Sequence, residues 1–68
     1  MWVDEITKIG AIKLDNNSVI FPLSKFSSVI RKDYIKIMSN DGCTIIIITD
    51  GEIEMGLTEK GIVMVKNS

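Results

Sequence analysis

The side chains able to do chemistry are few, and their spacing matches no catalytic arrangement. The 68-residue chain contains no histidine and one cysteine, Cys43. Without histidine, the common acid–base and nucleophilic schemes lack their usual proton carrier. Cys43 also has no partner for an internal disulfide or for a zinc site built from cysteine and histidine. The residue content therefore predicts a protein that is not an enzyme.

Three carboxylates stand at alternate positions, Asp50, Glu52 and Glu54. Alternate residues of a strand point to the same side, and a row of carboxylates can hold a hard cation. A calcium loop also needs backbone and side-chain oxygens at fixed positions, and this segment does not supply them. The isolated glycines likewise form no phosphate-binding loop. We therefore expect a solvated acidic surface here, with no metal and no cofactor.

Basic residues gather in one part of the chain and are interleaved with Phe26 and Tyr34. An aromatic ring beside cations can stack on a base while the cations bind phosphates. The net charge of −1, from eight basic and nine acidic residues, provides no general attraction for nucleic acid. A solvated set of charges is favoured, and a nucleic-acid surface is the alternative. Its candidate contacts are Lys13, Lys25, Arg31, Lys32 and Lys36.

The segment 43–49 organises the second half of the chain, because six of its seven residues are β-branched. Such side chains lose rotamer freedom in a helix and fit a pleated strand. Asp41-Gly42 precedes the segment and Asp50-Gly51 follows it, and Asp-Gly favours tight type I′ hairpin turns. We therefore expect a central strand, paired on both sides, within a meander over 34–56.

Two-residue turns at both ends place Ile37 opposite Ile46 and Ile48 opposite Ile53. Both turns then select one core face, formed by Ile35, Ile37, Ile46, Ile48, Ile53 and Met55. The reverse face carries an apolar group that, together with Trp2, resembles the aromatic and Met-rich centres of interfaces. The predicted partner-binding residues are Trp2, Tyr34, Met38, Ile45 and Ile47. In the alternative interpretation, the N-terminal segment covers this group within one chain.

The first half of the chain predicts a hairpin over 9–23. Asn16-Asn17 can fill a type I′ turn, because asparagine tolerates the left-handed region. The predicted pairs are Asp15/Ser18, Leu14/Val19, Lys13/Ile20 and Ile12/Phe21. This register puts Ile12, Leu14, Val19, Phe21 and Leu23 on one face.

A short helix over 25–30 is expected after this hairpin. Ser24 is a suitable N-cap, and Phe26, Val29 and Ile30 have the spacing of one helix face. A last strand is expected at 62–65. Residues 1–8 fit either a helix or a strand.

The predicted fold is therefore mainly β, a single domain over 1–68. About five antiparallel strands in hairpins would form a small sheet, roll or barrel. A chain of this length buries only about 60% of its unfolded surface, so its core is marginal. Self-association is the remaining source of support, because disulfides and zinc are excluded.

The order of the expected elements resembles the swapped-hairpin domain of the AbrB and MazE family. The resemblance covers 9 to about 49 and rests on Lys13-Leu14-Asp15, Val19-Ile20-Phe21-Pro22, the short helix, and 33–37 with Asp41-Gly42 beyond. It implies two interleaved chains that bind DNA through basic residues or act as an antitoxin. The sequence differs from the family at Asn17-Ser18, where a Gly-Arg pair is usual, and in the additional strands over 52–65.

The function predicted first is a non-enzymatic β binding module that acts through protein–protein contact or self-association. A viral or mobile-element protein that blocks a host complex would have these properties. The alternative is a dimeric DNA-binding regulator or antitoxin with swapped hairpins. No apolar run is long enough to span a bilayer, and the first residues lack the basic and apolar regions of a signal peptide. We therefore expect a cytoplasmic protein, in the host cell if it is viral.

Overall fold

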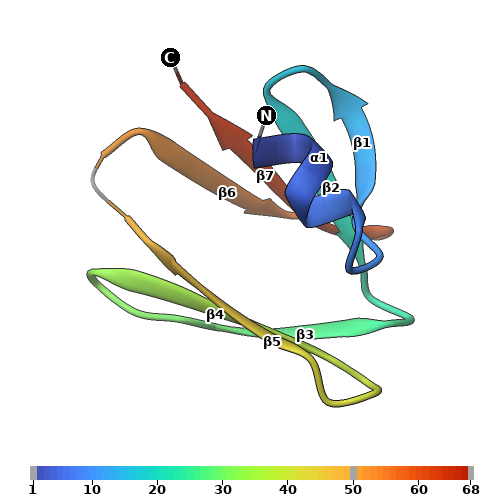
Figure 1. Cartoon of the computed structure of the whole chain (residues 1–68). Coiled ribbons are helices and arrows are strands. Elements are labelled where there is room, and N and C mark those ends of the chain that lie inside the picture. The colour runs from blue at the N-terminus through green and yellow to red at the C-terminus, as the bar shows by residue number, and fades with distance from the viewer. Residues whose placement is uncertain (1, 50, 68) are drawn as a thin grey trace.

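The computed structural model describes residues 2–49 and 51–67, which form one short helix followed by seven strands (Figure 1). The mainly β fold class is confirmed, with more strands than expected. The elements are α1 (Trp2–Thr7), β1 (Ile12–Asp15), β2 (Ser18–Pro22), β3 (Phe26–Ile30), β4 (Tyr34–Ser39), β5 (Thr44–Ile48), β6 (Ile53–Leu57) and β7 (Gly61–Lys66).

The strands form two antiparallel sheets that face each other. The first sheet has the order β1-β2-β7-β6, and the second has the order β3-β4-β5. The chain crosses between the sheets after β2 and again after β5 (Figure 1). No described strand pairs across the two sheets, so the molecule is not the closed barrel that was one of the expected forms.

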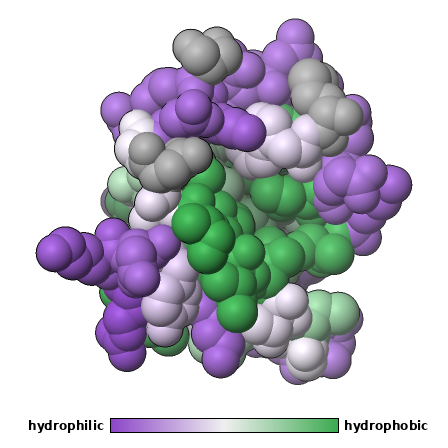
Figure 2. All heavy atoms as spheres, turned by 60° about the vertical axis from the view of Figure 1, so that its left-hand side comes forward, coloured by the Kyte–Doolittle hydropathy of each residue, from purple (hydrophilic) through white to green (hydrophobic). Residues whose placement is uncertain are grey.

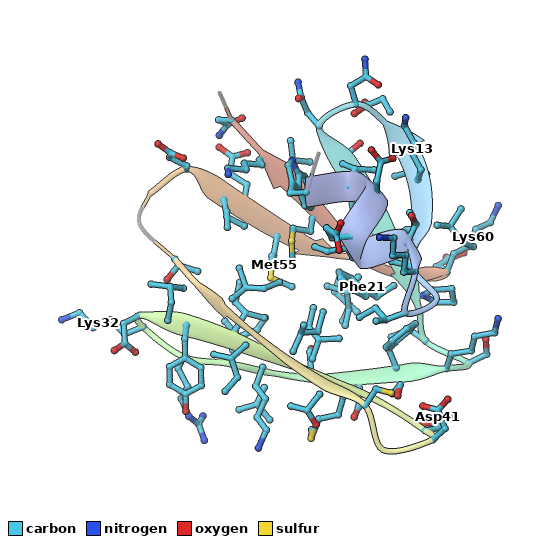
Figure 3. The ribbon with its side chains drawn as sticks, in the orientation of Figure 1. Lys13, Phe21, Lys32, Asp41, Met55 and Lys60 are labelled. Carbon is cyan, nitrogen blue, oxygen red and sulfur yellow. The ribbon has the colours of Figure 1, made fainter. Side chains whose placement is uncertain are left out.

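The apolar core lies between the sheets and is completed by α1. In Figure 3, Phe21 of β2 and Met55 of β6 point into the space between the sheets. The rings of Phe21 and Phe26 meet edge to face, with centroids 5.4 Å apart. The buried apolar residues are Val3, Ala11, Val19, Phe21, Phe26, Ile35, Ile37, Ile62 and Met64.

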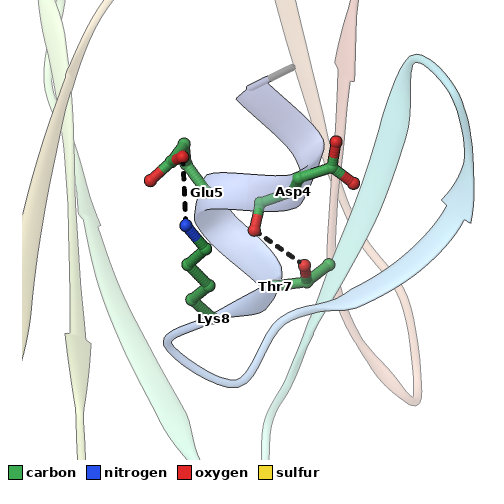
Figure 4. Close-up of polar contacts among 4 residues, drawn as sticks. All are labelled: Asp4, Glu5, Thr7 and Lys8. Atoms are coloured by element: carbon green, nitrogen blue, oxygen red, sulfur yellow. Dashed lines mark hydrogen bonds and ion pairs between the residues drawn. The ribbon is translucent and has the colours of Figure 1, made fainter.

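The helix α1 is too short to be stable by itself, so its packing must hold it. Val3 is fully buried in the core. The polar side of α1 is tied locally, because the Thr7 hydroxyl donates to the Asp4 carbonyl at 3.0 Å and Lys8 pairs with Glu5 at 3.2 Å (Figure 4). The segment 1–8, which the sequence left open, is thus helical over the residues of α1.

The expected helix over 25–30 is wrong, because this segment is strand β3. Val29 and Ile30 are β-branched, and so short a helix has little intrinsic stability. Pairing with β4 satisfies the backbone groups on one side of the segment instead, and the register sets Ser28 opposite Ile37. The strand also buries the Phe26 ring, which is 4% exposed.

The first hairpin has the expected location but a different turn. Asp15 pairs with Ser18 as predicted. The Asp15 carboxylate accepts a hydrogen bond from the Asn17 amide at 2.7 Å. No described residue other than glycine has a positive φ, so the expected type I′ turn is wrong. The aspartate side chain forms the turn, as in Asx turns.

A bulge at Leu14 changes the register beyond this turn. Lys13 pairs with Val19 and Ile12 pairs with Ile20, one residue away from the expected pairs. Val19 is buried as predicted, as is Phe21. The other three residues of the expected face are exposed, and they are Ile12, Leu14 and Leu23.

The loop between β4 and β5 is one residue longer than expected. The Ser39 amide donates to the Cys43 carbonyl at 2.8 Å, and the Gly42 amide donates to the Ser39 carbonyl at 3.1 Å. Three residues, 40–42, therefore form the loop, and Gly42 has φ +96°. A turn followed by a left-handed glycine is the usual three-residue hairpin loop.

This longer loop turns β5 over. Ile37 pairs with Ile45 rather than with Ile46. A one-residue shift sends every side chain of a strand to the other face. The predicted core positions of Ile46 and Ile48 are therefore wrong, and these side chains are 59% and 68% exposed.

The expected meander over 34–56 ends after β5. Strand β6 pairs with β7 instead of β5, with Met55 opposite Met64. The β6–β7 turn is closed by Thr58, whose amide and hydroxyl both donate to the Gly61 carbonyl at 2.8 Å. The expected turn at Asp50-Gly51 falls partly outside the described residues. The predicted strand 62–65 is confirmed within β7.

Candidate functional site

The described residues contain no side-chain cluster typical of a metal centre. Within 2–49 and 51–67, no group of three or more His, Cys, Asp or Glu side chains could hold a metal ion. Cys43 is exposed, beside the β4–β5 loop. Over the same residues, no helix is long and apolar enough to cross a membrane.

Among the described residues, two aspartates have lowered pKa values, and both are turn residues. The Asn17 amide lowers the pKa of Asp15 by donating to its carboxylate. The Ser39 hydroxyl lowers the pKa of Asp41 in the same way. A hydrogen bond to the charged form of a carboxylate favours ionisation. These carboxylates therefore stabilise hairpin turns and are not arranged as a proton-transfer pair.

The predicted partner-binding residues are divided between two surfaces. Side chains on β4 alternate, so those next to the buried Ile35 and Ile37 point away from the core. Tyr34 and Met38 therefore face outward. Ile45 and Ile47 lie opposite Ile37 and Ile35 and so face the core. The expected group is not brought together.

The outward side of the β3-β4-β5 sheet, which we call the outer face, carries an apolar surface around one cation. Directly opposed residues share a face, so Tyr34 lies beside Ile48 and Lys36 lies beside Ile46. Ile46 is 59% exposed and Ile48 is 68% exposed. The residues of the outer face are Ser27, Val29, Tyr34, Lys36, Met38, Thr44, Ile46 and Ile48.

The second surface is an apolar hollow at the open side between the sheets. Its volume is about 180 Å³. Figure 2 shows apolar side chains forming a continuous area on the side of the molecule where β5 and β6 lie, with polar residues around it. The hollow is lined by Trp2, Ile6, Ile47, Ile53, Met64 and Lys66. Trp2 and Ile6 of α1 thus line the same hollow as Ile47, whereas Met38 faces outward on the other side of the sheet, so the alternative interpretation of a covering N-terminal segment stays a prediction.

A second hollow, of about 160 Å³, lies at the other end of the second sheet. The Asn40 amide donates to the Lys25 carbonyl at 2.9 Å, which holds the β4–β5 loop against the start of β3. The Asn40 side chain also donates to the Ser24 carbonyl at 2.9 Å. The polar residues that line this second hollow are exposed and engaged in turn contacts. We therefore assign no ligand to this hollow.

The candidate nucleic-acid contacts do not form one patch. Lys13 and Lys32 lie at opposite ends of the molecule (Figure 3). Lys25 and Arg31 flank the five residues of β3, which span about 17 Å. Lys36 lies among the apolar residues of the outer face. The arrangement does not favour nucleic-acid binding, and that alternative stays a prediction.

The feature that the sequence did not predict is the free edge of β5. Strand β5 pairs only with β4, so it ends its sheet. The sequence indicated a central strand because two flanking turns were expected. The correct β4–β5 register could have been found from the loop residues Asn40, Asp41 and Gly42. They suit a three-residue loop with a left-handed glycine as well as a two-residue turn.

Comparison with known proteins adds no identification, because no family model, no curated protein and no solved structure matches the chain.

Proposed function

We propose that the chain is a non-enzymatic binding module that acts by contact with another protein through its outer face. The observation that carries this proposal is the two-sided apolar character of β5. Ile45 and Ile47 pack against the core, while Ile46 and Ile48 are left on the surface. An uncharged, β-branched strand exposed in this way is an aggregation hazard, and a partner that covers it removes that hazard.

The composition of the outer face supports a protein partner. Tyr34 and Met38 belong to the residue types enriched at the centres of interfaces. Lys36 contributes an aliphatic stem to the same surface and keeps its charged group in water. Blocking a host complex, as a viral protein would, is one use of such a surface.

The overall dimensions of the molecule are comparable to those of a standard interface. The molecule measures 30 × 25 × 22 Å. Its broadest side therefore covers on the order of 750 Å², against about 800 Å² per partner in a standard interface.

The proposal is tested by removing the apolar side chains of β4 from the outer face. The double variant Tyr34→Thr/Met38→Thr keeps residues that favour strands and removes the ring and the thioether. The matched control is Ile12→Thr/Leu57→Thr, which removes apolar side chains that are 54% and 76% exposed on the first sheet. All three chains would be used as baits in cells that express the protein naturally.

We expect the wild-type chain and the control to retain the same partner and the outer-face variant to lose it. Circular dichroism must show that both variants are folded. Equal recovery by all three chains would contradict the proposal, as would recovery of no protein by the wild type.

A further inference from the structure

Four strands end the two sheets, and they differ in how their free edges are protected. The edge strands are β1 and β6 of the first sheet and β3 and β5 of the second. Native proteins protect such edges with charges, prolines or bulges. Strand β1 has Lys13, Asp15 and the bulge at Leu14. Strand β6 has Glu54, with Glu52 and Glu59 just beyond its ends.

Strand β5 has none of these devices within Thr44–Ile48, and the nearest charged residues in the sequence are Asp41 and Asp50. Its five residues are one threonine and four isoleucines, and its pairing with β4 is regular over its whole length. The edge is therefore open to another strand on grounds of charge and of geometry.

The hydrogen bonds at the two ends of β5 show which backbone groups face β4. The Ser39 amide donates to the Cys43 carbonyl at 2.8 Å, and the Thr49 amide donates to the Asp33 carbonyl at 3.0 Å. Hydrogen-bonded pairs alternate with non-hydrogen-bonded pairs in an antiparallel ladder. The odd-numbered residues of β5 therefore bond to β4.

The even-numbered residues of β5 consequently direct their amides and carbonyls to the free edge. These residues are Thr44, Ile46 and Ile48. They are the same residues whose side chains lie on the outer face. A strand that pairs with this edge must present its own free backbone groups in the matching register.

We propose that the partner at this edge is β5 of a second copy, antiparallel, with the two-fold axis through Ile46. This inference rests on the proposed function, because it assumes that β5 acts by protein contact. Ile46 then lies opposite Ile46 of the second copy, and Thr44 lies opposite Ile48. All three free residues face free residues, which provides about six backbone hydrogen bonds. The result is one continuous six-stranded sheet.

The charges on the outer face permit this pairing. Lys36 lies beside Ile46 on β4, so the two copies of Lys36 are separated by both β5 strands. Three strand spacings place them about 14 Å apart. That distance exceeds the screening length of about 8 Å at physiological salt, so their repulsion is weak. Within Thr44–Ile48, only isoleucine and threonine side chains meet at the seam.

Two-fold antiparallel pairing with a second copy is not favourable at β3, the other edge of this sheet. The amides of Arg31 and Asn40 donate to the carbonyls of Tyr34 and Lys25, each at 2.9 Å, so the even-numbered residues of β3 are the free ones. A two-fold axis through Ser28 then sets Lys25 opposite Arg31 at both ends of the seam. Like charges directly opposite each other destabilise a strand pair. The assembly therefore closes at two copies.

A disulfide between copies tests the register directly. With the axis at Ile46, Cys43 lies opposite residue 49 of the second copy, and opposed Cα atoms about 4.5–5.5 Å apart are within disulfide range. Within one chain, residues 43 and 49 are about 20 Å apart along the strand and cannot bond. The full chain carrying Thr49→Cys should therefore oxidise to a covalent dimer.

The controls are the wild-type chain, whose single Cys43 lies about 20 Å from its counterpart in the dimer, and Ser27→Cys on β3. Both should stay largely monomeric on a non-reducing gel. Cross-linking of Thr49→Cys no greater than that of Ser27→Cys would overturn the proposal.

Opposite charges introduced separately at Ile46, which lies on the proposed two-fold axis, provide a second test. Ile46→Lys and Ile46→Glu each place like charges against each other in a homodimer and opposite charges in a mixed dimer. By light scattering, each variant alone should have the monomer mass of 7.6 kDa, and an equimolar mixture should have twice that mass. Because Ile46 is 59% exposed, both variants should fold. A wild-type chain that is monomeric up to its solubility limit would refute the dimer, and so would a mixture that stays monomeric.

The two proposals fail separately. If Thr49→Cys does not cross-link while Tyr34→Thr/Met38→Thr still loses its captured partner, the pairing at β5 is wrong and the binding function stands. If Thr49→Cys cross-links and the outer-face variant keeps every partner, the dimer stands and the outer face is not the binding surface.

Discussion

Gly61 shows how closely single residues of this small core are constrained. A β-carbon added at Gly61 would lie 2.3 Å from the Phe21 carbonyl oxygen, which belongs to the backbone and cannot move aside. Gly56, on the neighbouring strand, has no atom within 4 Å of the equivalent position. The two glycines differ only in what surrounds them.

We therefore expect Gly61→Ala to lower the free energy of unfolding by about 2–3 kcal/mol, a typical cost of overpacking. Gly56→Ala is the matched control and should change stability by less than about 1 kcal/mol. Chemical denaturation of both variants measures the difference. Equal stability of the two variants would contradict the close approach of β7 to β2.

The two turn aspartates predict a specific acid sensitivity. The pKa values of Asp15 and Asp41 are lowered in the fold by hydrogen bonds that the unfolded chain lacks. Both carboxylates therefore stabilise the fold above the unfolded pKa of about 3.9, and this contribution is lost as the pH falls through the lowered folded values.

The double variant Asp15→Asn/Asp41→Asn should be less stable than the wild type at neutral pH and should lose less stability on acidification. Thermal melts at neutral pH and at about pH 2.5, below the unfolded pKa of about 3.9, provide the comparison. Asp33→Asn is the control for the loss of an exposed carboxylate elsewhere in the chain. An unchanged pH dependence in the double variant would show that these hydrogen bonds do not contribute to stability.

At the scale of elements, strand positions were more predictable than strand faces. The β-branched runs predicted β4, β5 and β7, because that preference is local to each segment. The face of β5 depended on one additional loop residue, and the left-handed Gly42 allows either loop length. Either β5 or β7 could in principle pair with β6, and local sequence patterns do not indicate which of the two strands does so.

The candidate site was predicted only in part for the same reason. Tyr34 and Met38 do lie on the outer face, since the alternation of β4 was correct. Ile45 and Ile47 were assigned to this surface through the wrong loop, and their neighbours Ile46 and Ile48 occupy it instead. The helix expected at 25–30 failed because a spacing of three and four residues also occurs in a strand with mixed burial.

Shortening single isoleucine side chains tests which face of β5 packs against the core. Ile47 packs against the core, whereas Ile46 is 59% exposed. We expect Ile47→Ala to lower the free energy of unfolding by about 2 kcal/mol and Ile46→Ala to lower it by less than about 1 kcal/mol. Denaturation of dilute protein keeps association out of the comparison. The opposite order would support the two-residue loop.

At the scale of the whole molecule, the small core is consistent with the division of the strands between two open sheets. A chain of this length buries little surface, and the seven strands of the described residues are divided between two sheets with four edges. Charges or a bulge protect β1, β3 and β6, while β5 is unprotected at its edge and apolar on its outer side. The central claim is that β5 is the contact element of this protein.

Amide hydrogen exchange at Thr44, Ile46 and Ile48, measured at increasing protein concentration, tests this claim most directly. These three amides face the free edge in a single copy and bond to the second copy in the proposed pair. We expect their exchange to slow as concentration rises, while the amide of Ser28 on the β3 edge exchanges rapidly throughout. Rapid exchange of all three β5 amides at every concentration would show that β5 does not pair with a second copy.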